Sequence, residues 1–136
     1  EAHEEREVAI SELDKYFNEY PKGDIMVYMF LAEGFEEIEA LCPLDLLRRA
    51  GADVTLAGVG GTELTGSHAI RVTADIDASD VDSLDYDMVV VPGGMPGTLH
   101  MDDSEIVDKT LAAVNANGGF LAAICAAPLV LGKEAI

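Results

Sequence analysis

A single cysteine stands where an apolar segment meets a set of small residues. The segment Ala122-Ala123-Ile124-Cys125-Ala126-Ala127-Pro128 places Cys125 between the expected end of a strand and the start of a helix. A sharp strand-to-helix turn needs small neighbours, strains the backbone of its central residue and puts a helix N-terminus behind a thiolate. The pattern indicates a nucleophilic cysteine. The alternative is a buried cysteine that packs as a small apolar side chain.

Two glycines supply a second candidate element. The motif Pro92-Gly93-Gly94 directly follows the apolar residues 86–91. Ligands of open α/β sheets bind at the carboxyl ends of the strands, so we expect this motif near Cys125. The backbone N–H groups of Gly94 and Ala126 could then form an oxyanion hole beside the sulfur. An ordinary turn is the alternative, because Pro-Gly-Gly suits one equally well.

Glu39 is the candidate acid or base. It lies in a helix predicted over residues 36–50, one turn beyond Glu36 and Glu37, which we expect to interact with the helix dipole. Apolar residues flank Glu39 on both sides, which predicts a partly buried carboxyl. Beside a thiolate, burial favours a protonated carboxyl that can donate a hydrogen bond to sulfur or move a proton.

Short apolar runs that alternate with helical segments predict an α/β domain around a mostly parallel sheet. Core strands are predicted at residues 25–32, 52–58, 86–91 and 120–124, a hairpin at 62–73, and helices at 36–50 and 102–117, with a short helical start after Cys125. Residues 75–87 contain six Asp and no basic residue, which predicts an acidic surface loop. Pro43 should bend the first helix or free a carbonyl.

Residues 1–24 differ in character from the rest of the chain. Apolar side chains recur there three and four residues apart among many charges, which predicts an amphipathic helix that packs without chemistry. We therefore expect an N-terminal helical extension over 1–24 and one α/β domain over 25–136.

The composition excludes several classes of protein. The 136 residues include 26 acidic and 8 basic side chains, a formal net charge of −18, which argues against nucleic-acid binding. No apolar run reaches the roughly 18 residues of a membrane helix, and no signal peptide is visible. The two cysteines, Cys42 and Cys125, make no disulfide framework, which favours a reducing cytoplasm.

No metal or nucleotide cofactor is expected from the motifs. The segment Gly58-Val59-Gly60-Gly61 follows a strand, but the third glycine of a dinucleotide fingerprint would fall on Glu63, and no Walker lysine exists. The Asp-rich stretch lacks the glycine and glutamate of a calcium loop. His3, His68 and His100 are dispersed without paired ligand spacing.

Three segments together resemble the DJ-one (ThiJ/PfpI) superfamily, in its Parkinsonism-associated deglycase branch with the bacterial ThiJ-like proteins. They are Glu33-Gly34-Phe35-Glu36-Glu37-Ile38-Glu39-Ala40, Val91-Pro92-Gly93-Gly94 and the cysteine segment described above. The run Leu44-Asp45-Leu46-Leu47-Arg48-Arg49-Ala50-Gly51 strengthens the match. The resemblance covers residues 25 to about 128.

The resemblance implies a flavodoxin-like three-layer sandwich, a homodimer and a site without a cofactor. By motif match, Cys125 is the nucleophile, Glu39 the protonated carboxyl, and Gly94 and Ala126 the backbone donors, with Gly93 beside them. The family is credited with converting methylglyoxal or glyoxal to hydroxy acids and with deglycation, and also with redox sensing and chaperone activity. A cysteine-dependent glyoxalase or deglycase acting on small reactive carbonyls is therefore the leading hypothesis.

Neighbouring branches of the superfamily differ next to the nucleophile. The protease-like branch has His directly after the cysteine, where this chain has Ala126. Class I amidotransferases have glycines two positions on either side, where this chain has Ala123 and Ala127. Peptidase and amidotransferase chemistry are both disfavoured.

The chain departs from the family pattern at both ends. It adds the segment 1–24 and stops soon after the cysteine, without the family's last third, which supplies a histidine near the thiol. His100 could approach the site in its place. We therefore expect apolar surface to be left uncovered. Two hypotheses compete with the glyoxalase or deglycase: a redox-responsive stress or chaperone protein that senses oxidation at Cys125, and an inactive fragment that keeps the fold.

Overall fold

A parallel sheet forms the centre of the computed structural model, which describes residues 25–81 and 86–133. Its strand order is β5-β2-β1-β6-β7, and every neighbouring pair is parallel. The strands are β1 (Met26–Ala32), β2 (Asp53–Val59), β5 (Ile76–Asp77), β6 (Met88–Val91) and β7 (Phe120–Ala123). The helix predicted over 1–24 lies outside the described residues.

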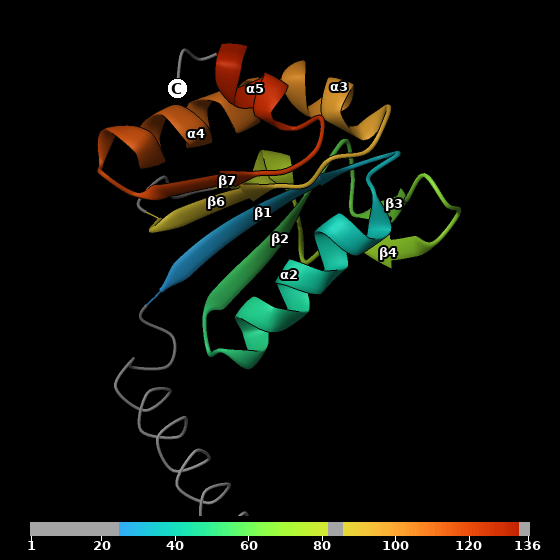
Figure 1. The fold of residues 1–136 in the computed structure, drawn as a ribbon, viewed down its shortest axis with the longest axis horizontal. Helices are drawn as coiled ribbons and strands as arrows, with labels where there is room; N and C mark the ends of the chain where they lie inside the picture. The colour runs from blue at the N-terminus through green and yellow to red at the C-terminus, as the bar shows by residue number, and fades with distance from the viewer. Residues whose placement is uncertain (1–24, 82–85, 134–136) are drawn as a thin grey trace, which may run out of the picture.

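Helices cover the two faces of this sheet unequally. Helix α2 (Glu37–Arg49) packs on one face, and α3 (Gly97–Asp102), α4 (Glu105–Ala116) and α5 (Pro128–Lys133) lie on the other (Figure 1). The predicted α/β three-layer sandwich with a mostly parallel sheet is confirmed. None of the helices in the described part of the chain is long and apolar enough to cross a membrane.

Strand β1 shows why the central strands are almost continuously apolar. Tyr28 and Phe30 belong to the core on the α4 side of the sheet, whereas Val27, Met29 and Leu31 belong to the core on the α2 side. All five are almost completely buried. Successive side chains of a strand point to opposite faces, so a strand covered on both sides must be apolar at every position.

Helix α2 positions the candidate carboxyl of Glu39. The side chain of Glu36 caps the helix by accepting a hydrogen bond of 2.8 Å from the Glu39 N–H. Acidic residues occupy the first turn and Arg48 and Arg49 the last, as the helix dipole favours. The helix continues through Pro43, whose missing N–H leaves the Glu39 carbonyl without its usual helical donor.

Several elements match the predictions only in part. The hairpin expected at 62–73 is present as β3 (Glu63–Thr65) and β4 (Arg71–Thr73). The acidic stretch expected to be a surface loop contains β5 and the short 3-10 helix η1 (Ala78–Asp80). The side chain of Asp77 caps η1 by accepting a hydrogen bond from the Ser79 N–H. The helix expected at 102–117 is shorter, and α3 precedes it.

The strand predicted as a core strand at 120–124 lies at the edge of the sheet. β7 pairs only with β6 among the described strands. Phe120 is 74 % exposed and Ile124 52 % exposed, so the prediction of a core strand is wrong at both ends of the segment 120–124. Apolar sequence alone does not show which neighbours a strand has.

Candidate active site

Cys125 occupies a sharp turn between β7 and α5. The strand ends at Ala123 and the helix begins at Pro128, so the connection is short. Cys125 has a φ of +60°, a left-handed conformation that costs a residue other than glycine free energy. Its side chain is exposed, and the thiol is free. The alternative of a cysteine packed in the core is therefore wrong.

Gly93 is the contact point between the candidate carboxyl and the candidate nucleophile. Its N–H donates a hydrogen bond of 2.9 Å to Oε2 of Glu39. A Cβ added to Gly93 would lie 2.4 Å from that same oxygen and 2.8 Å from the Cβ of Cys125. Because both atoms lie so close to one point, the carboxyl of Glu39 and the side chain of Cys125 are near neighbours. Only glycine fits between them.

The backbone around Gly94 is equally constrained. Gly94 has a φ of +101°, and a Cβ there would meet the backbone nitrogen of Glu36 at 2.3 Å. In the described part of the chain, neither the Gly94 N–H nor the Ala126 N–H donates a hydrogen bond to another protein group. Both amides therefore lack an acceptor among the described residues. These are the two donors that the sequence suggested for an oxyanion hole.

His100, suggested above as a substitute for the family's histidine, lies in helix α3. Its side chain is exposed, and no hydrogen bond or ion pair joins it to Cys125 or Glu39 within the described residues. Nothing in this arrangement favours His100 as a partner of the thiol.

An apolar groove runs beside the candidate site, between α2 and strands β6 and β7. Its volume is about 400 Å³, and Glu39 lies in its wall. The other lining residues are nearly all apolar: Ile38, Cys42, Pro43, Leu46, Val90, Val91, Ala122, Ala123 and Ile124. Large apolar side chains exposed here include Ile38 and Leu46, as expected for a sheet face that α2 covers only in part.

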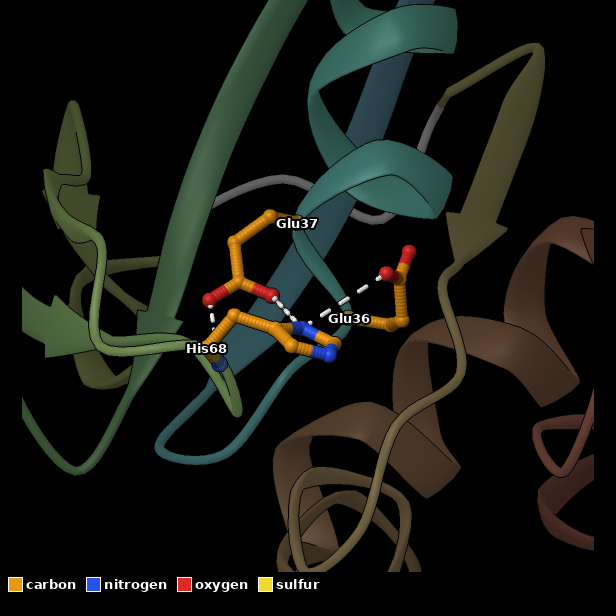
Figure 2. A group of neighbouring side chains, drawn as sticks. All are labelled: Glu36, Glu37 and His68. Atoms are coloured by element: carbon orange, nitrogen blue, oxygen red, sulfur yellow. Dashed lines mark hydrogen bonds and ion pairs between the residues drawn. The ribbon is translucent and has the colours of Figure 1, made fainter.

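A second polar cluster, which the sequence spacing did not reveal, joins the start of α2 to the β3–β4 hairpin. Glu37 is buried, and its carboxylate accepts hydrogen bonds from the His68 N–H at 2.6 Å and from His68 Nδ1 at 2.8 Å. Oε1 of Glu36 lies 3.8 Å from the same ring nitrogen (Figure 2). Glu37 thus binds the hairpin in addition to any effect on the helix dipole. Thirty-one residues separate Glu37 from His68, so no local motif could have indicated the contact.

The contacts within this cluster change the pKa values of Glu37 and His68. Burial alone would raise the pKa of Glu37, but hydrogen bonds from the side chain and backbone of His68 outweigh it and lower that pKa to about 2. The hydrogen bond to Glu37 and the negative charge of Glu37 raise the pKa of His68. The two groups therefore form an ion pair at moderately acidic pH.

Comparison with known proteins identifies the chain's relatives. The model of the DJ-1/PfpI family matches residues 26–136. Protein dj-1beta of Drosophila melanogaster is 41 % identical over 109 residues, which are 79 % of this chain and 58 % of that protein. A protein of Caenorhabditis elegans named glutathione-independent glyoxalase DJR-1.2 is 32 % identical over 99 residues, or 73 % of this chain and 53 % of that protein.

Solved structures agree with these sequence matches. The structure described as Toxoplasma gondii DJ-1, oxidized, has a TM-score of 0.78 and 38 % identity, and the match covers 81 % of this chain and 61 % of that one. The chain thus spans somewhat more than half the length of the relatives it matches.

Proposed function

The chain belongs to the DJ-1/PfpI family, and from that membership we propose that it is a cofactor-independent, cysteine-dependent glyoxalase or deglycase acting on methylglyoxal-type carbonyls. The contact at Gly93 is the observation that supports this most directly, because it sets a carboxyl beside a strained, exposed cysteine. The relative named as a glutathione-independent glyoxalase points to the same chemistry.

The proposed reaction begins with addition of the Cys125 thiolate to the aldehyde carbon. A C–S bond forms, and the N–H groups of Gly94 and Ala126 stabilise the resulting oxyanion. The protonated carboxyl of Glu39 donates its proton to this oxyanion and becomes a carboxylate. The carboxylate then removes the proton from the same carbon and delivers it to the neighbouring carbonyl carbon by way of an enediol. The first carbon is oxidised to a thioester while the second is reduced to an alcohol, so no external electron acceptor is required. Water hydrolyses the thioester, which releases a hydroxy acid and frees Cys125.

Lactate formation from methylglyoxal tests this proposal. We expect Cys125→Ser and Glu39→Gln each to lower kcat at least about 100-fold, in keeping with the size of nucleophile and acid–base effects. Cys42→Ser is the matched control, because it removes the other exposed cysteine, and it should retain full turnover. Equal turnover in all four proteins would contradict the catalytic proposal. A folded chain with no turnover at all would favour the third hypothesis, a fragment that keeps only the fold.

A redox-responsive stress or chaperone protein is the second candidate function. The exposed thiol of Cys125 supports it, and so does the relative whose structure is described as oxidized. Mass spectrometry after mild peroxide treatment should detect sulfinic acid on Cys125 before any oxidation of Cys42. Oxidation of Cys42 first would remove the basis for a sensor at Cys125.

Assembly and location also belong to the proposal. We expect a homodimer, which the exposed apolar groove beside α2 supports. We expect a cytoplasmic protein, because its only two cysteines are both free. Light scattering in solution would test the first expectation, and fractionation of cells that express the chain would test the second.

A further inference from the structure

Three side chains outside the Cys125 site converge where α2 begins. One potential ligand atom from each of Glu36, Glu37 and His68 lies within 4.8 Å of the other two. Nδ1 of His68 lies 3.8 Å from Oε1 of Glu36 and 2.8 Å from Oε2 of Glu37. Figure 2 shows the ring nitrogen of His68 facing both carboxylates, which come from successive residues at the start of α2 while the histidine comes from the hairpin. None of the three belongs to the proposed catalytic machinery.

We propose that Glu36, Glu37 and His68 bind a divalent transition-metal ion of the Zn²⁺ type. One imidazole nitrogen and two carboxylate oxygens are a donor set that Zn²⁺ accepts. Bonds of about 2.0–2.2 Å in tetrahedral geometry place ligand atoms roughly 3.3–3.6 Å apart. The observed separations from Nδ1, 2.8 Å to Glu37 and 3.8 Å to Glu36, fall on either side of that range. Movements of about half an ångström in these side chains would bring both separations into that range.

The remaining oxygen of each carboxylate is fixed by a backbone N–H. Oε2 of Glu36 accepts from the Glu39 N–H at 2.8 Å, and Oε1 of Glu37 accepts from the His68 N–H at 2.6 Å. These bonds orient Oε1 of Glu36 and Oε2 of Glu37 toward the same ring nitrogen. Hydrogen bonds that hold metal-binding groups in place before the ion arrives are a usual feature of metal sites.

Charge also favours a cation in this position. Two carboxylates face a nitrogen that carries at most one proton, and a divalent ion would neutralise both. The whole chain has a formal net charge of −18, which raises the local concentration of cations. The His68 side chain is 67 % exposed, so an ion can enter from solvent and keep water in its remaining coordination position.

Calorimetric titration of the chelator-treated chain with ZnCl₂ tests the inference. We expect one equivalent to bind, and both His68→Ala and Glu36→Gln to weaken that binding at least about 10-fold. His68→Ala keeps the backbone N–H that donates to Glu37, and Glu36→Gln keeps a side-chain oxygen that can cap α2, so both variants should fold. Circular dichroism checks that they do.

Two control variants separate this site from other zinc ligands. The double variant His3→Ala/His100→Ala removes the other two histidines, and Cys125→Ser removes the nucleophile; both should bind zinc as tightly as the wild type. Absence of binding, or unchanged affinity in His68→Ala, would overturn the inference. Loss of binding in Cys125→Ser would also overturn it, because the ion would then lie at the catalytic thiol. Failure of the glyoxalase proposal affects none of these outcomes.

Discussion

The side chain of Glu39 and the backbone of Gly93 are joined by a hydrogen bond of 2.9 Å, although 54 residues separate them in the sequence. The bond connects α2 to the loop that follows β6. It holds the carboxyl on the same side of Gly93 as the Cβ of Cys125. The relation between acid and nucleophile therefore depends on a glycine that carries no functional group.

Gly93→Ala should damage the site without removing any catalytic atom. The new methyl group would lie 2.4 Å from the Glu39 oxygen and 2.8 Å from the Cys125 Cβ, so both side chains must move. We expect a loss of about 1–3 kcal/mol in the free energy of unfolding and a large loss of methylglyoxal turnover. Gly132→Ala is the control, because its added Cβ meets nothing within 4 Å. Urea denaturation and the lactate assay measure the two effects, and normal turnover in Gly93→Ala would contradict the site geometry.

Glu39 should contribute to stability separately from catalysis. Glu39→Ala leaves the buried Gly93 N–H without its acceptor, which we expect to cost about 1–3 kcal/mol. Glu39→Gln keeps an acceptor oxygen and should recover most of that loss while remaining inactive. Urea denaturation of both variants checks the difference. Equal destabilisation by the two substitutions would contradict a stabilising role for this hydrogen bond.

The strain at Cys125 can be measured by substitution. Cys125 has a φ of +60°, and a left-handed conformation costs a residue with a Cβ about 1–2 kcal/mol relative to glycine. Glycine also makes the unfolded chain more flexible, which offsets part of this gain. Cys125→Gly should therefore be more stable than Cys125→Ala by about 1 kcal/mol. Ala126→Gly is the control, because Ala126 has no positive φ, and it should lower stability. Equal thermal stability of Cys125→Gly and Cys125→Ala would show that the turn is unstrained.

Much of the fold could be predicted because strong local patterns determine it. The continuous apolar run of β1 indicated a strand covered on both faces, and the charges at the two ends of α2 marked its limits. The two-residue strand β5 and the six-residue helix α3 escaped prediction, because elements so short show no periodicity. The edge position of β7 depends on pairing between distant segments, which apolar composition does not report.

The residues of the candidate site and of the polar cluster could also be predicted only in part. Cys125, Gly93 and Glu39 could be proposed because each follows a strand at the same edge of the sheet. The pairing of Glu37 with His68 could not, since a hairpin must fold back onto α2 before the two meet. The sequence did not distinguish the buried Glu37 from its neighbour Glu36, because both were expected to interact with the helix dipole.

The ion pair between Glu37 and His68 should make stability depend on pH. The raised pKa of His68 means that its contribution is complete below its ordinary value of 6.5 and is lost as the pH rises through the raised value. The lowered pKa of Glu37 means that its contribution is present above pH 4.5 and is lost as the pH falls through about 2.

The stability difference between wild type and His68→Ala should therefore be greatest between the two ordinary pKa values, 4.5 and 6.5, and shrink in alkaline solution. Thermal melts with a chelator at about pH 5.5 and about pH 9 measure it. His100→Ala, which removes a histidine without a carboxylate partner in the described residues, should show no such change between the two pH values. A difference for His68→Ala that stays constant with pH would exclude the ion pair.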